Sequence, residues 1–254
     1  MQQIAQAKEI SIIMSSFCIG HKMRATKANA IIVAAGEGER MGMDKISLEI
    51  VGKPVIIHTM EQFQSSSLVS EMVIVLSSKN LSNNRLMRQI RSYGEKVSVC
   101  EGGPTRQESV MQGLQIIGDS DLMIVHDGAR PCVTKEIIEK GIDLMNCDCL
   151  TTAGVISGIQ STDTIKEVNE RGTVIATLDR KKLWEIQTPG VFVSEVLRRA
   201  YAHAEDEVTD DATLVENLGC IVKVYPGSRY NIKLTTPEDI TIATYIILRR
   251  TSLA

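Results

Sequence analysis

The feature that most constrains this chain is the alternation, from residue 29 onward, of short apolar runs with longer amphipathic stretches. Four runs rich in β-branched and aliphatic residues predict buried strands: Ala30–Ala35, Glu71–Leu76, Val97–Cys100 and Leu122–His126. The amphipathic stretches between and after them predict helices: Pro54–Gln64, Asn83–Tyr93, Thr105–Ile116 and Thr134–Met145. This order indicates an α/β fold, a Rossmann-like and mostly parallel sheet with helices on both faces. Because right-handed crossovers bring the carboxyl ends of the strands to one edge, we expect a ligand to bind there.

A β-hairpin is predicted to interrupt the alternation. Two β-rich runs, Asp163–Val168 and Thr173–Leu178, are joined by the segment Asn169–Gly172, whose composition is typical of a hairpin turn. An inserted hairpin has too little surface of its own to be stable, so it must pack on something else. Two interpretations are open: the hairpin is an arm that packs on a second copy of the chain, or it folds back on its own domain.

The chain is predicted to be one domain preceded by an extension. The domain covers residues 29–254, with the β-arm at about residues 160–180. Its last helix is expected to begin near Thr235, where a hydroxyl, a proline and two carboxylates suit a helix start. Residues 1–28 contain one short apolar run, which is well below the roughly 20 residues that span a bilayer. A weakly packed extension or an upstream start codon is one interpretation of this segment, and a targeting segment is the other.

Composition excludes several classes of partner. The net charge of the 254 residues is −3, and Lys and Arg are spread along the chain without a basic block, so nucleic-acid binding is not expected. The six cysteines form no CxxC pair and lie at no zinc-like spacing from the histidines. We therefore expect a reduced, cytoplasmic protein with no structural metal and no membrane partner.

The first predicted strand leads into a glycine-rich loop, AAGEGERMG, at residues 34–42. Glycines allow backbone N–H groups to approach a phosphate closely. The loop is not a P-loop, because GK[ST] is missing, and it does not complete a GxGxxG dinucleotide fingerprint. Arg40 and Lys45, two cations close to this loop, suit a triphosphate. The alternative is a solvated arginine and lysine at a turn.

Further motifs follow along the chain: Gly102–Val110 (GGPTRQESV), His126–Pro131 (HDGARP), Thr177–Arg180 (TLDR), Gln187–Pro189 (QTP), Val208–Ala212 (VTDDA) and Tyr230–Thr235 (YNIKLT). Together with the glycine-rich loop they resemble the 2-C-methyl-D-erythritol 4-phosphate cytidylyltransferase family of the non-mevalonate isoprenoid pathway. The resemblance runs from about residue 29 to residue 250. It implies a nucleotide-diphospho-sugar transferase type of fold, a homodimer joined by the β-arm, and transfer of CMP from CTP to 2-C-methyl-D-erythritol 4-phosphate with Mg²⁺ and release of pyrophosphate.

The resemblance also implies roles for individual residues. The catalytic set that it implies is Arg40, Lys45, Lys233 and Asp127, with Asp127 holding Mg²⁺ directly or through water. The residues implied around CTP are Ala34, Ala35, Gly36, Gly38, Gly103, Arg106, Ser109 and Gly128. Those implied around the acceptor phosphate, besides Lys233, are Arg130, Thr164, Arg180 and Thr188, of which Thr164 and Arg180 come from the arm of another subunit. For Asp127 a loop-capping role is the alternative, and for Arg180 a surface position without function. Asp210 and Asp211 are expected to cap a helix rather than to bind metal.

Three departures from the family pattern keep other functions open. The loop before Lys45 is shorter than usual and places Asp44 where it could repel a triphosphate or help hold Mg²⁺, and Gly190 stands where the family has glutamine. The Met-Gly-x-Asp-Lys segment also resembles guanylyltransferases of the molybdenum-cofactor pathway, but that likeness ends at the first loop. The alternatives are therefore a cytidylyltransferase for another polyol phosphate, such as ribitol 5-phosphate, and a nucleotide-binding regulatory protein that has lost catalysis.

Overall fold

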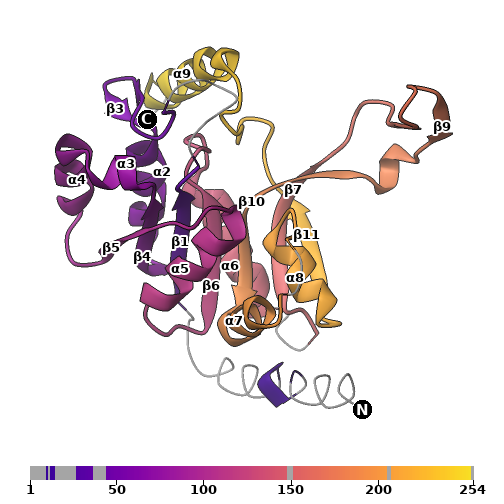
Figure 1. Ribbon diagram of the computed structural model, residues 1–254, viewed down its shortest axis with the longest axis horizontal. Helices are drawn as coiled ribbons and strands as arrows, with labels where there is room; N and C mark the ends of the chain where they lie inside the picture. Colours follow the sequence, from indigo (N-terminus) through magenta and orange to yellow (C-terminus); the bar gives the residue numbers. More distant parts are fainter. Residues whose placement is uncertain are drawn as a thin grey trace.

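The computed structural model describes residues 10, 12–14, 27–36, 44–147, 151–204 and 207–252. Its centre is a seven-stranded sheet in the order β11-β7-β10-β6-β1-β4-β5 (Figure 1). The strands are β1 (Ala28–Ala34), β4 (Val69–Leu76), β5 (Val97–Glu101), β6 (Leu122–Asp127), β7 (Gly154–Gln160), β10 (Trp184–Val193) and β11 (Val222–Pro226). A separate two-residue pair, β2 (Glu49–Ile50) and β3 (Lys53–Pro54), precedes the first long helix.

Most of this sheet is parallel, as the alternation of strands and helices predicts. Strand β1 pairs in parallel with both β4 and β6, and Val33 lies opposite Val75 on one side and Asp127 on the other. Strand β10 is the exception, because it runs antiparallel between β6 and β7. The carboxyl ends of β1, β4, β5 and β6 therefore meet at one edge, where the ligand is expected.

The helices are α2 (Val55–Ser65), α3 (Ser78–Leu81), α4 (Asn84–Arg91), α5 (Arg106–Ile116), α6 (Lys135–Cys147), α7 (Ser194–Ala202), α8 (Asp211–Asn217) and α9 (Pro237–Ser252). Helices α5, α7 and α8 cover one face of the sheet and α2 and α6 the other (Figure 1). The core lies between these layers and contains fully buried Ile31, Ile32, Phe63 and Phe192. No helix in the described part of the chain is long and apolar enough to cross a membrane.

The predicted hairpin is present and projects from the body of the molecule (Figure 1). Strands β8 (Lys166–Val168) and β9 (Val174–Thr177) pair antiparallel, followed by a short 3-10 helix, η2 (Arg180–Lys182). Gly172, with φ of +75°, closes the turn by donating its N–H to Asn169 O at 2.9 Å. Within one chain the hairpin is therefore an extended arm and does not fold back on its own domain.

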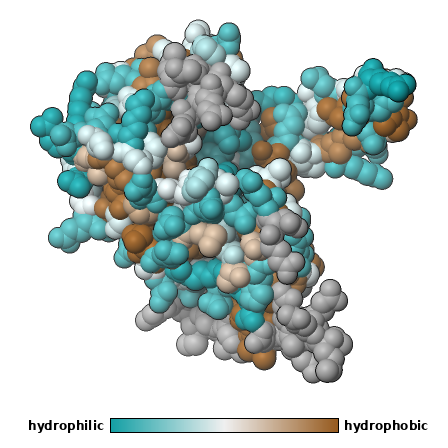
Figure 2. Space-filling model, in the orientation of Figure 1, coloured by the Kyte–Doolittle hydropathy of each residue, from teal (hydrophilic) through white to brown (hydrophobic). Residues whose placement is uncertain are grey.

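Apolar side chains of the arm face solvent. Figure 2 shows hydrophobic residues at its outer end. The exposed apolar residues of the arm are Ile165, Val168, Val174, Ile175 and Leu178, of which Ile175 is 60% exposed.

Candidate functional site

Asp127, the last residue of β6, lies at the carboxyl edge of the sheet and is surrounded by three cationic side chains. Lys233 Nζ lies 2.9 Å from its Oδ2, Arg106 Nε 3.1 Å from its Oδ1 and Arg130 Nε 3.6 Å from its Oδ2. Burial by itself would raise the pKa of Asp127, but Arg106, Lys233 and Arg130 together lower it well below its ordinary value. The carboxylate is therefore ionised at neutral pH, and it holds three positive charges together at one point of the sheet edge.

A cavity of about 730 Å³ opens in front of this cluster. Residues from the ends of β1, β5 and β6 and from the start of α5 line it, and the predicted residues among them are Ala34, Ala35, Gly36, Lys45, Gly103, Arg106, Ser109, Asp127 and Lys233. Its size lies in the range that holds a nucleotide-sized ligand. The structure thus brings together most of the residues that the sequence assigned to CTP.

A second cavity, of about 270 Å³, lies on the other side of the cluster. Arg130, Thr188, Ile186 and Asp211 are among its lining residues. Arg106, Asp127 and Lys233 line both cavities, so the same charged side chains form the wall between them. A site of this shape can bind two anionic ligands and bring them into contact at that wall.

Thr188 and His126 fix the backbone at Asp127. The Asp127 N–H donates to Thr188 Oγ1 at 3.0 Å, and His126 Nδ1 lies 3.1 Å from the same hydroxyl. His126 is fully buried, and burial lowers its pKa to about 3, so the imidazole is neutral at neutral pH. Thr188 was predicted to bind the acceptor phosphate; it lines the second cavity, but its hydroxyl also holds Asp127 in place.

Lys45 and Lys233 approach the first cavity from opposite ends of the sequence. Lys45 Nζ donates to the backbone carbonyl of Leu234 at 3.1 Å, which places it beside the Lys233 segment. Asp44 turns away from this cavity, because its carboxylate accepts hydrogen bonds from Ile46 N at 3.0 Å and Ser47 Oγ at 2.6 Å. Through these contacts Asp44 caps a turn.

Two of the predicted small residues act through packing. A Cβ on Gly103 would lie 2.4 Å from Glu108 Cβ, and one on Gly128 would lie 2.9 Å from Ala34 Cβ. Gly103 lines the first cavity, whereas Gly128 supports the wall behind Ala34. The Ser109 hydroxyl also lines the cavity and donates to Thr105 O at 2.9 Å inside α5.

Asp211 and Tyr201 belong to the cluster and were not predicted to do so. Arg106 Nη1 and Nη2 donate to the two oxygens of Asp211 at 3.0 and 2.8 Å, and Tyr201 OH donates to Asp211 Oδ1 at 2.5 Å. The expectation that both aspartates cap a helix is right for Asp210, which accepts from Thr213 N at 2.9 Å. It is wrong as the main role of Asp211, because its carboxylate is engaged by an arginine from α5. The VTDDA motif was the only signal in the sequence, and it does not identify the partner.

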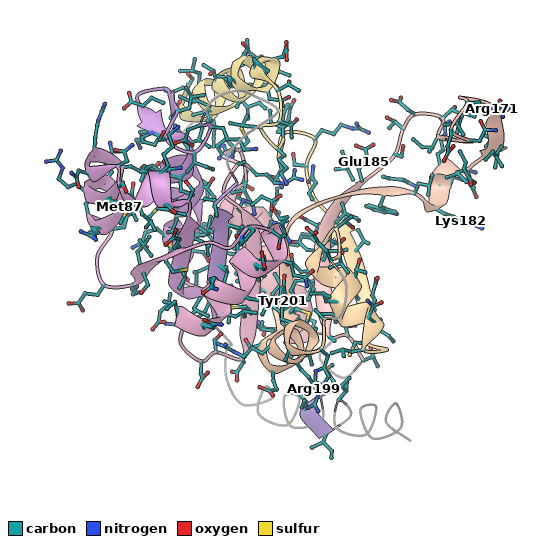
Figure 3. The ribbon with its side chains drawn as sticks, in the orientation of Figure 1. Met87, Arg171, Lys182, Glu185, Arg199 and Tyr201 are labelled. Atoms are coloured by element: carbon teal, nitrogen blue, oxygen red, sulfur yellow. The ribbon has the colours of Figure 1, made fainter. Side chains whose placement is uncertain are left out.

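The remaining predicted residues lie elsewhere. Thr164 and Arg180 are exposed on the arm, where Arg180 Nη1 donates to Thr162 O at 2.8 Å. Figure 3 shows the same separation, with Arg171 and Lys182 on the arm and Tyr201 in the body. One chain therefore does not bring its own arm residues to its own Asp127 cluster. Gly38 and Arg40 lie outside the described residues.

The doubly wound sheet and its paired cavities define the class: an α/β enzyme that binds phosphate-bearing substrates at the carboxyl edge of its strands. A family model described as IspD, 2-C-methyl-D-erythritol 4-phosphate cytidylyltransferase, matches residues 28–250. The chain belongs to this family.

Individual members of the family are similar over most of this chain. A 2-C-methyl-D-erythritol 4-phosphate cytidylyltransferase of Alkaliphilus metalliredigens is 41% identical over 236 residues, and the match covers 89% of this chain and 95% of that protein. One of Dehalococcoides mccartyi strain 195 is 37% identical over 222 residues, 87% of this chain and 96% of that protein. The crystal structure of the 4-diphosphocytidyl-2C-methyl-D-erythritol synthase of Anaerococcus prevotii is similar with a TM-score of 0.77 and 29% identity, covering 88% of this chain and 97% of that one.

Proposed function

We infer that this protein transfers CMP from CTP to 2-C-methyl-D-erythritol 4-phosphate, giving 4-diphosphocytidyl-2-C-methyl-D-erythritol and pyrophosphate. The observation that carries the inference is the pair of cavities separated by Arg106, Asp127 and Lys233. The larger cavity suits CTP and the smaller one a polyol phosphate, so both phosphate groups would meet at the shared cations. Family membership supports the choice of these two substrates, and it disfavours ribitol 5-phosphate as the acceptor.

The chemistry requires charge stabilisation rather than a base. The second pKa of a phosphate monoester is about 6, so the attacking oxygen of the acceptor is already anionic at neutral pH. That oxygen forms a bond to the α-phosphorus of CTP, and the bond from this phosphorus to the bridging oxygen of the β-phosphate breaks, so that pyrophosphate leaves. Both partners are anions, and catalysis therefore depends on positioning and on preorganised positive charge. Lys233 and Lys45 are the residues that we assign to the α-phosphate, and Arg130 and Lys233 those that we assign to the acceptor phosphate.

Mg²⁺ is the cation that we propose for CTP, with Asp127 as its protein ligand. No group of three or more acidic, histidine or cysteine side chains that could form a complete metal cage occurs among the described residues. Mg²⁺ is usually bound through one or two carboxylates, with substrate phosphates and water completing its shell. A single ionised carboxylate at the wall of the larger cavity fits that mode. When bound, the ion would neutralise charge that develops on the departing pyrophosphate.

The working protein is proposed to be a cytoplasmic homodimer joined through the arms. The apolar residues of the arm support this, because a two-stranded hairpin alone is only marginally stable and these side chains need a surface on which to pack. Thr164 and Arg180 would then reach the acceptor phosphate in the partner's site.

The experiment that tests this function is pyrophosphate release with Mg²⁺ and CTP, comparing methylerythritol 4-phosphate with ribitol 5-phosphate and CTP with GTP. We expect turnover with CTP and methylerythritol 4-phosphate only. Turnover that favours ribitol 5-phosphate or GTP would assign a different substrate to the same site. CTP binding without turnover on either acceptor would contradict the enzymatic function altogether.

A further inference from the structure

Arg106 is the most constrained cation at the wall between the two cavities. Its side chain begins at the first residue of α5, whose start is fixed by a capping box between Thr105 and Glu108. Its guanidinium contacts two carboxylates at once: Nε donates to Asp127 Oδ1, and both terminal nitrogens donate to Asp211. A planar guanidinium bound end-on by one carboxylate cannot rotate about its last bond without losing both hydrogen bonds.

Asp211 is itself held in place from a different part of the fold. It begins α8, its side chain is 5% exposed, and Tyr201 of α7 donates to the oxygen that also accepts from Arg106 Nη1. Burial alone would lower the pKa of Arg106, but its contacts with Asp211 and Asp127 raise it above its ordinary value. Burial and the contact with Asp211 both raise the pKa of Tyr201, so both groups remain protonated. A buried carboxylate such as Asp211 must be paired with cations or hydrogen-bond donors. Burial alone does not require that one of these partners be Arg106, a residue of the wall between the two cavities.

We propose that Asp211, supported by Tyr201, is a positioning residue for the transfer reaction. It holds the Arg106 guanidinium so that Nε faces the Asp127 carboxylate while Asp211 engages both terminal nitrogens. Asp127 then keeps one fixed hydrogen bond on Oδ1, and Lys233 and Arg130 share Oδ2. Without Asp211, Arg106 would be free to pair differently with Asp127 or with a substrate phosphate. This inference rests on the proposed function for its kinetic consequence, but the geometry of Arg106 can be measured independently.

The competing explanation is that Asp211 only ties α8 to α5. The chain offers a matched control, because Gln107 makes another connection between the same regions: its Oε1 accepts from Val208 N at 3.1 Å. Gln107 is the neighbour of Arg106, but its side chain is not among the residues that line either cavity. Gln107→Ala therefore weakens this connection without changing the contacts of Arg106.

The geometric test is the ¹⁵N NMR spectrum of the arginine side chains, with the Arg106 signals assigned from Arg106→Lys. In the wild type we expect an Nε–H protected from exchange and separate, slowly rotating Nη–H₂ signals. Asp211→Asn should lose both properties, Tyr201→Phe should weaken them, and Gln107→Ala should retain them. Wild-type Arg106 signals in Asp211→Asn would overturn the proposal. If the wild type shows no turnover on any acceptor, the proposed function fails and this spectrum alone decides the positioning role.

The kinetic test is a double-mutant cycle between Asp211→Asn and Arg106→Ala, measured as kcat at saturating substrates and well below the unfolding temperature. Loss of a residue that orients a charged group at a site typically costs about 10- to 100-fold in activity, and we expect that loss in kcat with little change in the KM for CTP. In the Arg106→Ala background Asp211→Asn should cost nothing further. Independent, additive losses, or an unchanged kcat in Asp211→Asn, would leave Asp211 with a structural role only. If Asp211→Asn does not fold, Tyr201→Phe replaces it in the same cycle, with the same two outcomes.

Discussion

The Asp127 cluster and the arm place their side chains in opposite environments. In the cluster, charged side chains are largely buried, and each is matched by opposite charge from the same chain: Asp127 with Lys233 at 2.9 Å and Asp211 with Arg106 at 2.8 Å. In the arm, apolar side chains are exposed, with Val174 at 54% and Ile175 at 60%. The cluster buries charge, which costs free energy unless the charge is paired. The arm exposes apolar side chains, which cost free energy unless another surface covers them.

The difference shows which part of the site a single chain completes. The cluster is compensated internally, so it can be preorganised before any substrate arrives. Among the described residues nothing covers the exposed apolar side chains of the arm, and burying one such side chain would stabilise an interface by about 1.5–3 kcal/mol. This contrast agrees with the proposal that the body carries the transfer chemistry and that the arm of a second copy completes the acceptor site.

The largest expected effect concerns the body. Lys233→Ala removes a charge that we assign to the α-phosphate, and losing a group that stabilises the transition state typically lowers kcat by about 100- to 1,000-fold. The free energy of unfolding should change much less, because the Lys233 side chain is 36% exposed and Asp127 keeps Arg106 and Arg130. Steady-state kinetics and urea denaturation measure the two effects. Lys79→Ala, which removes an exposed lysine on α3, is the control, and equal losses of activity and stability in Lys233→Ala would show that the lysine is structural.

In the proposed dimer, the body and the arm that form one site belong to different chains. Lys233→Ala disables the body and Arg180→Ala disables the arm, so each variant alone should be nearly inactive. In a dimer that contains one subunit of each variant, one of the sites combines an intact body with an intact arm. An equimolar mixture whose subunits exchange at random should therefore recover about one quarter of the wild-type sites. Subunit exchange is checked by native mass spectrometry of the mixture. Exchange without recovered turnover would place Arg180 outside the partner's site.

A smaller effect is expected when the arm loses part of its apolar surface. Ile175→Lys places a charge where we expect a buried contact, and the lost burial of about 1.5–3 kcal/mol should weaken the dimer at least about tenfold. Sedimentation equilibrium at micromolar concentration measures this change. Ile242→Lys is the matched control, because Ile242 is 47% exposed on α9 in the body. If the dissociation constant changes equally in both variants, or in neither, the arm is not part of the interface.

The sequence predicts some regions of the fold better than others. The parallel half, β6-β1-β4-β5, was predicted because each strand is rich in β-branched and aliphatic residues and an amphipathic stretch follows it. Strands β7, β10 and β11 were missed: β7 contains two glycines, and β10 contains Pro189-Gly190 in its middle. Those residues are typical of turns, and only pairing with β6 on one side and β7 on the other makes β10 a strand, with a register shift between Ile186 and Gly190.

The candidate site shows the same limit. Asp127 and Lys233 were predicted because they lie in motifs that resemble a family. Asp211 and Tyr201 were not, because their role depends on α7 and α8 packing beside the start of α5, and Arg106 and Asp211 are 105 residues apart in the chain. Local patterns identify residues at strand ends, whereas pairing between helices from distant segments follows only from the packed structure.

The smallest effect is expected at Asp44, the neighbour in sequence of Lys45, which lines the larger cavity. Asp44→Asn should change the KM for CTP by less than about threefold, because the carboxylate accepts hydrogen bonds from its own turn and from Asn80 Nδ2. A marked fall in KM would mean that Asp44 repels the triphosphate. A loss of Mg²⁺ dependence would mean that Asp44 helps to hold the ion.

The main effect of Asp44→Asn should be on the stability of the fold. Burial raises the pKa of Asp44, but the hydrogen bonds from Ser47, Asn80 and the turn outweigh it and lower the pKa below 3.8. The ionised form therefore stabilises the fold above that pH, and the contribution is lost as the pH falls through the lowered pKa. The difference in unfolding free energy between wild type and Asp44→Asn should shrink from pH 7 to pH 3, and a difference that grows on acidification would contradict this assignment.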